Sequence, residues 1–189
     1  GIAVLLLGGF LFVNAMLTRV GDLDLDKSAL GIDPVVSENL GDYRNILLLG
    51  VDARDMNDYD HCRTDAIIIM SIDNKNDEVR QISVYRDTYL YTDEAHGYDK
   101  ITNVHSKAGT EATIKTLNQN MDLNIDEVVL VNWKVVADTV DGLGGIEVDV
   151  LESEVAEMNK YIPDTQANIG GSGDLIEAPG LQTLNGNQA

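Results

Sequence analysis

Cysteine and basic residues are both scarce in this sequence, which contains only Cys62 among its 189 residues. A single cysteine excludes a disulfide within the chain and any zinc site built from several cysteines. Thirteen lysines and arginines stand against 32 aspartates and glutamates, which leaves a net charge of −19. Such a surface is a poor match for nucleic acid, whose binding depends on neutralising phosphates. We therefore expect no nucleic-acid partner.

The signature motifs of several large enzyme classes are also absent. The sequence has no GxxxxGK[ST] phosphate loop, no HExxH zinc motif and no GxSxG nucleophile motif. His61, His96 and His105 are scattered in loops or near a helix start, so we expect surface residues rather than ligands. The GLGG run at 142–145 is typical of a helix end followed by a turn.

Charge is absent from residues 1–17, GIAVLLLGGFLFVNAML. This length is at the short end of what spans a bilayer, and we predict a single transmembrane anchor. A cleaved signal peptide would need a small-x-small site, and Asn14–Met16 supplies no convincing one. A buried core helix is the other alternative, but the segment lacks an amphipathic face. Residues 18–44 are acidic and contain glycines and a proline, so we predict a linker, with the folded domain at 45–189.

Three short, β-branched apolar runs follow the linker, and we predict a strand for each: Ile46–Val51, Ala66–Ile72 and Val79–Val84. Asn74–Asp77 is a plausible hairpin turn, which makes the second strand antiparallel to the third. Further on, the patterns predict helices at 106–121, 134–143 and 152–161, and strands at 127–132 and 146–150. Strands separated by helices, with one clear hairpin, indicate an α/β sandwich with a mixed sheet.

Charged residues gather where the first three strands begin and end, namely Asp52, Arg54, Arg63, Asp65, Arg86 and Asp87. If the strands are neighbours, all six charges meet at one edge of the sheet. Two carboxylates suit Mg²⁺, which takes the rest of its shell from water and phosphate oxygens. Arginine forks suit bidentate phosphate contacts, so the group can serve phosphoryl transfer. Structural ion pairs also cluster at strand ends, and spacing alone does not separate the two interpretations.

Five segments in order resemble the extracellular catalytic domain of the LytR-CpsA-Psr family. They are ILLLGVDAR, RTDAIIIMSI, ISVYRDTYLY, YDKITNVHSKAGTEATIKTLNQNMDLNIDEVVLVNW and DGLGGIEVDV. The resemblance implies a three-layer α/β/α sandwich with an apolar groove for a polyprenyl tail, preceded by one transmembrane helix. It also implies a magnesium-dependent enzyme that transfers teichoic acid or capsular polysaccharide from undecaprenyl-pyrophosphate carriers to peptidoglycan, outside the cell membrane.

The resemblance also implies roles for individual residues. Asp52 and Asp65 would bind Mg²⁺, whereas Arg63 and Arg86 would bind pyrophosphate and take part in catalysis. The remaining substrate-binding positions would be Arg54, Asp87, Lys100 and Asn103. Two departures from the family pattern stand out, since Tyr85 replaces the usual proline before the RDT motif and the step from Lys100 to Asn103 is one residue longer than usual. The family continues past LNGNQA with further arginines, so we expect part of the site to lie beyond Ala189.

Two other functions are compatible with these residues. A non-catalytic protein that binds polyprenyl (pyro)phosphate would keep the arginines and the apolar groove but would need no metal. A transcriptional attenuator of the cell envelope, which the family's name suggests, fits poorly with a net charge of −19 and a membrane anchor.

Overall fold

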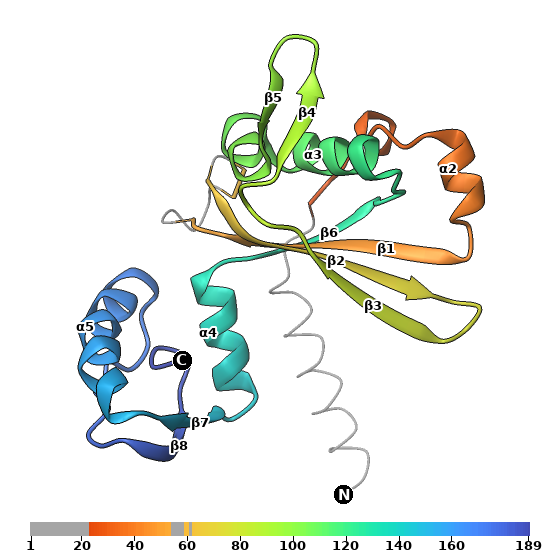
Figure 1. Cartoon of the computed structure of the whole chain (residues 1–189). Coiled ribbons are helices and arrows are strands. Elements are labelled where there is room, and N and C mark those ends of the chain that lie inside the picture. The colour runs from red at the N-terminus through yellow and green to blue at the C-terminus, as the bar shows by residue number, and fades with distance from the viewer. Residues whose placement is uncertain (1–22, 54–58, 61) are drawn as a thin grey trace, which may run out of the picture.

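The computed structural model describes residues 23–53, 59–60 and 62–189 (Figure 1). The predicted anchor at 1–17, together with Arg54 and His61, lies outside these residues. Within the described ranges, no helix combines the length and apolarity that a membrane crossing needs.

A mixed four-stranded sheet lies at the centre of the larger part of the molecule, with the strand order β3-β2-β1-β6. Its strands are β1 (Tyr43–Val51), β2 (Thr64–Asp73), β3 (Glu78–Ser83) and β6 (Glu127–Val131). β2 runs antiparallel to both β1 and β3, whereas β6 runs parallel to β1. The predicted neighbouring strands, the hairpin turn between β2 and β3 and the mixed sheet are therefore confirmed.

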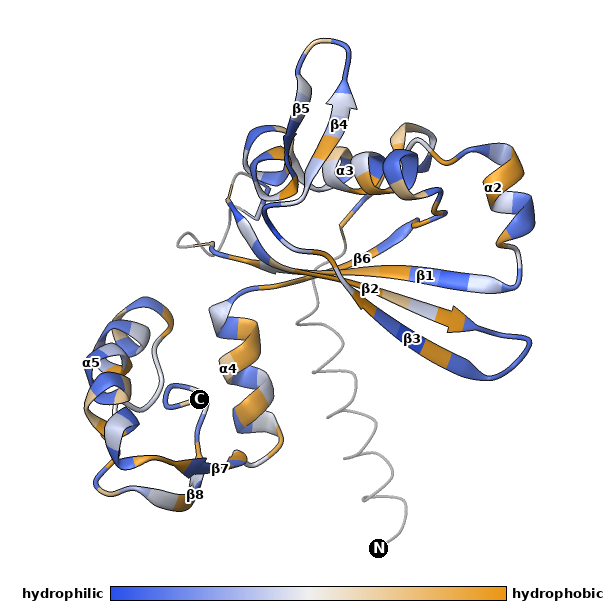
Figure 2. Cartoon of the chain, in the orientation of Figure 1, coloured by the Kyte–Doolittle hydropathy of each residue, from blue (hydrophilic) through white to orange (hydrophobic). Residues whose placement is uncertain are grey.

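Alternation along the strands turns every second apolar side chain toward one helix-covered face of the sheet. Leu47 and Leu49 on β1 and Ile67 and Ile69 on β2 are at most 1% exposed. They pack in one core with Ile114 and other residues of the long helix α3 (Ile101–Met121). The helix lies over this face of the sheet, and apolar residues line the strands beneath it (Figure 2).

The opposite face of the sheet is apolar but only partly covered. Ile46 and Leu48 on β1 and Ile68 and Met70 on β2 alternate with the core residues and are partly exposed. Val129 on β6, which pairs with Leu48, is 47% exposed. The mixed α/β class is thus confirmed, whereas a complete third layer over this face stays a prediction.

The segment 23–42 differs from the predicted linker because it packs on the sheet and α3. It contains a short 3₁₀ turn η1 (Lys27–Ala29) and the helix α2 (Pro34–Asn39), whose N-cap is Asp33. Leu30 is fully buried in the core, and its carbonyl accepts a hydrogen bond from the Asn118 side chain at 2.9 Å. Composition alone suggested a spacer, but one buried leucine with a buried amide partner holds the segment in place.

A second hairpin and the start of α3 also differ from the sequence-based boundaries. β4 (Tyr89–Asp93) pairs with β5 (Gly97–Lys100), so the predicted loop at 93–102 contains a strand. α3 begins at Ile101, earlier than the predicted 106, and continues through a kink at Gly109. The hairpin projects from the side of α3 that faces away from the four-stranded sheet (Figure 1).

The remaining elements form a smaller group, which we call the C-terminal unit (133–189), as distinct from the sheet unit (23–131). It comprises α4 (Trp133–Gly142), β7 (Ile146–Val150), α5 (Glu152–Ile169) and β8 (Gly180–Leu184), with β7 and β8 paired antiparallel. Its own core contains Val150, Ile162, Ile176 and Leu184. α5 runs eight residues past the predicted end at Tyr161 and continues through Pro163.

Candidate functional site

The strand ends bring the predicted charges that the structure describes to one edge of the sheet, here called the charged edge: Asp52, Arg63, Asp65, Arg86 and Asp87. β1 ends at Val51 directly before Asp52, and the Asp52 N–H donates to the carbonyl of Arg63 at 2.9 Å. A register shift between Gly50 and Val51 follows from the pairs Gly50–Ala66 and Val51–Thr64, which leaves Asp65 as the extra residue on β2. Such a bulge bends the strand and re-aims its side chain.

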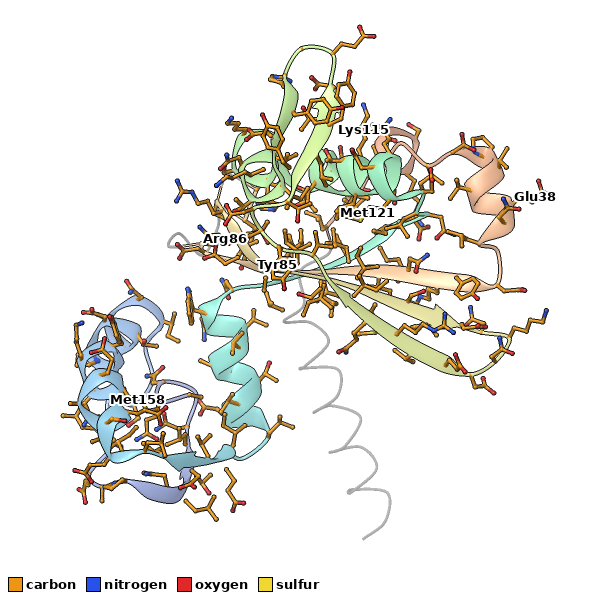
Figure 3. The ribbon with its side chains drawn as sticks, viewed as in Figure 1. Glu38, Tyr85, Arg86, Lys115, Met121 and Met158 are labelled. Carbon is orange, nitrogen blue, oxygen red and sulfur yellow. The ribbon has the colours of Figure 1, made fainter. Side chains whose placement is uncertain are left out.

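Arg86 reaches this edge from the turn that follows β3. Its guanidinium forms an ion pair with Asp65, and its Nε lies 3.9 Å from Asp87. The Arg86 carbonyl accepts a hydrogen bond from the Thr102 N–H at 3.1 Å, so the turn is fastened to the first turn of α3. Figure 3 shows Tyr85 and Arg86 together at this end of the sheet.

The Arg86–Asp65 pair is accessible to a ligand. The two side chains are 44% and 51% exposed. Exposed ion pairs of this kind typically contribute less than about 1 kcal/mol to stability. A bound phosphate can therefore replace the aspartate at the guanidinium at little cost, and the pair is compatible with both a structural and a binding role.

Lys100 and Asp87 extend the charged edge along the start of α3. The Lys100 Nζ donates to the Asp87 carboxylate at 2.7 Å, and this hydrogen bond lowers the pKa of Asp87. Lys100 is also the N-cap residue of α3. Two of the predicted substrate-binding residues, Asp87 and Lys100, are thus in direct contact.

Asn103 does not reach the Asp87 carboxylate but bonds to Asp99, a residue that the sequence interpretation missed. The Asn103 side chain donates to Asp99 at 2.9 Å, and Lys107 donates to the same carboxylate at 2.6 Å. The bond from Lys107, followed by that from Asn103, lowers the pKa of Asp99 to about 2. The predicted helix began at 106, so the preference of carboxylates for helix N-termini gave no signal at Asp99, which lies just before the observed start of α3 at Ile101.

A buried polar cluster ties the loop before Arg63 to the kink of α3. His105 is fully buried, and its Nδ1 lies 2.8 Å from the Cys62 carbonyl. Its Nε2 lies 3.3 Å from the Thr110 hydroxyl, which in turn donates to Asp60 at 2.7 Å. The expectation of a surface histidine at 105 was wrong, because this imidazole finds polar partners from the loop inside the core.

Gly109 makes this arrangement possible. Its φ of 79° and ψ of −169° interrupt the helix and leave the Thr110 N–H free to bond Asp60 at 3.2 Å. That region of conformational space is essentially restricted to glycine. Asp60 thus caps the second half of α3.

Asp52 and Asp65 are the carboxylates that could hold a divalent cation here. Both are exposed, and they come from adjacent strand ends. The Asp52 carboxylate has no ion-pair or hydrogen-bond partner among the described residues. Among those residues, no group of three or more metal-binding side chains occurs. A pair of oxygen donors fits Mg²⁺, which keeps several waters and takes further oxygens from phosphate.

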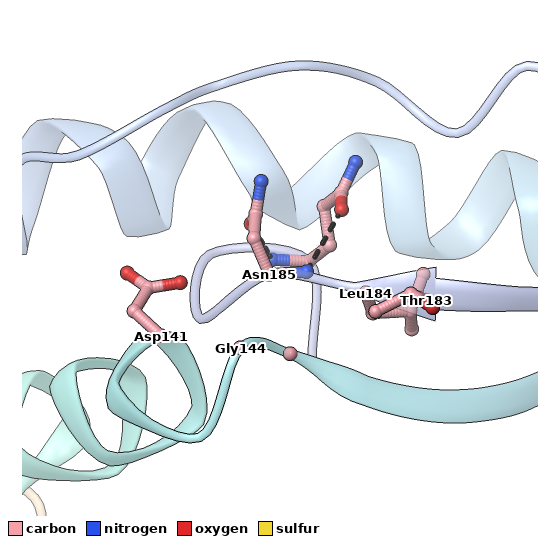
Figure 4. A pocket seen from close by; sticks show the side chains of 7 residues that line it. Asp141, Gly144, Thr183, Leu184 and Asn185 are labelled. Atoms are coloured by element: carbon pink, nitrogen blue, oxygen red, sulfur yellow. Dashed lines mark hydrogen bonds between the residues drawn. The ribbon is translucent and has the colours of Figure 1, made fainter.

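A solvent-open depression in the C-terminal unit lies outside this site. It has a volume of about 260 Å³ and is lined by Asp141, Gly144, Gly145, Thr183, Leu184, Asn185 and Gln188 (Figure 4). No predicted site residue lines it. The predicted turn after α4 is confirmed, since Gly144 and Gly145 both have positive φ.

Comparisons with known proteins point in one direction. The curated polyisoprenyl-teichoic acid–peptidoglycan teichoic acid transferase TagT of Bacillus subtilis (strain 168) is 33% identical over 147 residues, which cover 77% of this chain and 43% of TagT. TagU of the same strain is 36% identical over 125 residues, which cover 66% of this chain and 40% of TagU. The chain thus spans about two fifths of the length of these relatives.

Solved structures agree with the sequence matches. A structure of TagT bound to LI-WTA aligns with a TM-score of 0.57 at 27% identity, over 89% of this chain and 56% of TagT. Another, of the LytR-CPS2A-psr family protein YwtF (TagT) with bound octaprenyl pyrophosphate lipid, aligns with a TM-score of 0.56 at 26% identity, over 90% and 58%. The LytR_cpsA_psr family model matches residues 22–189. The chain therefore belongs to the LytR_cpsA_psr family.

Proposed function

We propose that this protein is a membrane-anchored phosphotransferase that acts outside the cell. It transfers a glycopolymer of teichoic acid or capsular type from an undecaprenyl-pyrophosphate carrier to peptidoglycan. The observation that carries the proposal is the charged edge, where neighbouring strand ends carry the carboxylates of Asp52 and Asp65 together with Arg63 and Arg86. The names of the relatives TagT and TagU support the class of reaction.

The arginines would bind the pyrophosphate of the carrier lipid. Arg86 would exchange Asp65 for a phosphate oxygen, with Arg63 and Arg54 as further guanidinium donors. Lys100, held by Asp87, would stand at the rim of the site with Asn103. Phosphoryl transfer depends mainly on positioning and on neutralising phosphate charge, which is what such a group supplies.

Asp52 and Asp65 would hold Mg²⁺, whose chemistry here would be to neutralise charge on the pyrophosphate oxygens. The hydroxyl oxygen of the acceptor sugar attacks the phosphorus that carries the glycan. The bond from that phosphorus to the bridging oxygen breaks, and polyprenyl phosphate leaves. Asp52 or Asp65 would accept the hydroxyl proton, and the product is a phosphodiester between the glycopolymer and peptidoglycan.

We propose that the polyprenyl chain binds to the partly exposed apolar face of the sheet. Leu48 pairs with Ile68 on β2 and with Val129 on β6, so the three side chains form an apolar row across that face, and β1 continues from this row to the charged edge at Asp52. A lipid pyrophosphate has the same arrangement, with an apolar tail attached to a charged head. Octaprenyl pyrophosphate should therefore bind more tightly than inorganic pyrophosphate.

The test is binding and turnover in the wild-type chain and in matched variants. Trp133 is the only tryptophan, is 63% exposed and follows β6 at the same end of the sheet, so its fluorescence can report lipid binding. We expect Arg86→Ala to weaken octaprenyl pyrophosphate binding at least tenfold. Arg80→Ala, which changes an exposed arginine of β3 paired with Glu78, should leave binding unchanged.

Turnover separates an enzyme from a carrier protein. Polyprenyl phosphate released from a glycan-linked pyrophosphate lipid should require Mg²⁺ and an acceptor glycan, and Asp52→Ala should abolish it while lipid binding persists. Tight lipid binding with no turnover, unaffected by Mg²⁺ or by Asp52→Ala, would instead establish a non-catalytic lipid-binding protein. Equal loss of lipid binding in Arg86→Ala and Arg80→Ala would show that the charged edge is not the specific binding site of the lipid pyrophosphate.

A further inference from the structure

Three tyrosines form an exposed aromatic cluster on the β4–β5 hairpin. Tyr89 and Tyr98 stack with ring centroids 5.9 Å apart and planes inclined by 21°, and Tyr91 meets Tyr98 edge to face at 5.4 Å. They remain 65%, 60% and 38% exposed, respectively. Clusters of large exposed rings are unusual on a protein surface and mark places where something binds.

The strand register sets all three rings on one face of the hairpin. Tyr91 lies directly opposite Tyr98, and Tyr89 lies opposite Lys100. Leu90 points to the other face and packs against the main core. The tyrosine face is therefore turned away from the core of the sheet unit.

The hairpin holds these rings in place before any ligand arrives. The side-chain amide of Asn120 donates to the Tyr91 carbonyl at 2.7 Å, and its oxygen accepts from the Tyr91 N–H at 3.1 Å. The edge of β4 is thereby fastened to α3. A surface that is ordered in the free protein loses little entropy on binding, which favours recognition of a weakly held ligand.

The aromatic cluster is continuous with the charged edge. Lys100 shares the face of the tyrosines and bonds Asp87, which follows Arg86 directly. A molecule lying along the hairpin would therefore reach the residues to which we assign the pyrophosphate. This continuity favours one of the two substrates of the proposed reaction as the ligand of the tyrosine face.

Sugar rings suit this surface. The C–H face of a pyranose packs against an aromatic ring, and tyrosine hydroxyls supply hydrogen bonds at the rim, since the side chain is amphipathic. Tyr89 and Tyr91 from β4 and Tyr98 from β5 form one continuous aromatic surface, which can contact more than one sugar of a linear glycan. Both substrates of the proposed reaction, the glycopolymer donor and the peptidoglycan acceptor, contain sugars. The charge of the hairpin therefore has to indicate which of the two binds there.

The tip of the hairpin is acidic. Asp93 and Glu94 lie there, and the bonds that His96 donates from its backbone and ring lower the pKa of Asp93. Carboxylates at this point repel a polyanionic teichoic acid and an anionic membrane surface alike. A glycan backbone of N-acetylated sugars carries no such penalty.

We propose that the tyrosine face of the β4–β5 hairpin binds the acceptor, a neutral N-acetylhexosamine strand of the peptidoglycan type. The identity of this glycan as the acceptor rests on the proposed function. Binding itself does not, because it needs neither the carrier lipid nor Mg²⁺.

The experiment measures binding of a soluble β-1,4-linked N-acetylglucosamine hexamer to the chain by amide chemical shifts. We expect shifts centred on residues 89–100 and at least tenfold weaker binding in Tyr89→Thr/Tyr98→Thr. The single variant Tyr98→Phe, with Tyr89 unchanged, should retain most of the wild-type affinity, since it keeps the ring. Tyr161→Thr, at a 51% exposed tyrosine on α5, is the matched control and should bind like the wild type.

Two further probes give outcomes that would overturn the proposal. Poly(glycerol phosphate) or phosphatidylglycerol vesicles that bind through the tyrosines in preference to the hexamer would assign the face to the donor polymer or to a membrane. Hexamer binding that is absent, or equal in the double variant, would also overturn it. If the wild-type chain binds the hexamer but transfers no glycopolymer, the proposed function alone is contradicted. If it transfers glycopolymer but does not bind the hexamer, this inference alone is contradicted.

Discussion

The sheet unit and the C-terminal unit differ both in the size of their cores and in the chemistry that they carry. Among the described residues, thirteen buried apolar side chains form the core of the former and four that of the latter. All predicted site residues belong to the sheet unit. Every arginine of the chain precedes Thr88, and residues 133–189 contain only two lysines as basic residues.

This difference shows what a charged site requires from its scaffold. Asp52, Asp65 and Arg86 are exposed, and they are placed by strand pairing and by hydrogen bonds from backbone groups beneath them. Rigid placement of that kind needs a core large enough to hold several strands in register. The C-terminal unit has a two-stranded sheet and one small cluster, which is a marginal core.

The largest expected effect on stability comes from a leucine-to-alanine substitution made in the core of each unit. Leu47 and Leu184 are both at most 1% exposed. Leu47→Ala should lower the free energy of unfolding of the whole protein by about 2–5 kcal/mol. Leu184→Ala should instead open only the C-terminal unit, because its cluster does not include residues of the sheet core.

Hydrogen exchange measures this distinction residue by residue. In Leu184→Ala, amides of β7, β8 and α5 should lose protection while those of β1 and β2 keep it. Equal loss of protection in both units would show that they unfold together, which would contradict the idea that the C-terminal unit has a separate, weaker core.

A smaller effect is expected for glycines in the two units. Gly109→Ala should cost about 1–3 kcal/mol, since alanine does not readily adopt φ of 79° and ψ of −169°. The kink should straighten and the Asp60–Thr110 bonds should weaken, which would loosen the loop before Arg63. Thermal unfolding and octaprenyl pyrophosphate affinity should therefore both fall.

Gly142→Ala is the matched control. Gly142 is the last residue of α4, has no positive φ, and an added Cβ would meet no atom within 4 Å. Alanine is the better helix former, so stability should be unchanged or slightly higher. A loss as large as that of Gly109→Ala would show that α4 depends on a feature specific to glycine.

The smallest effect concerns pH. The pKa of Asp99 is about 2 in the folded protein, below the ordinary value of 3.8. Its bonds to Lys107 and Asn103 therefore stabilise the fold above about pH 4, and this contribution is lost as the pH falls through 4 toward 2. Linkage puts it at about 1–2 kcal/mol, because the side chain is partly exposed.

Urea unfolding at pH 7 and pH 3 tests this expectation. Asp99→Asn should lower stability at pH 7 and flatten the acid limb of the pH profile. Asp138→Asn, which breaks the exposed pair with Lys134 in the C-terminal unit, should change stability by about 0.5 kcal/mol or less. An acid limb that is identical in Asp99→Asn and the wild type would assign the acid sensitivity to other carboxylates.

Local patterns in the sequence were sufficient for the central sheet and for most of the charged edge. The runs Ile46–Val51 and Ala66–Ile72 are strands, as their apolar composition and flanking turns indicated. The meeting of Asp65 with Arg86 followed from antiparallel pairing, because strand ends joined through a hairpin must return to the same edge. β7 was predicted with its observed bounds.

Long-range partners were the part that only the tertiary structure decided. The sequence determined which segments are strands or helices and which charges sit at their ends, because those properties depend on neighbours along the chain. Leu30, His105 and Asp99 were misjudged or missed, since their environments come from residues far away: Asn118 for Leu30, Cys62 for His105, and a helix that begins earlier than its periodicity suggested for Asp99. Burial and hydrogen bonding depend on which surfaces meet, and that is settled only when the whole chain packs.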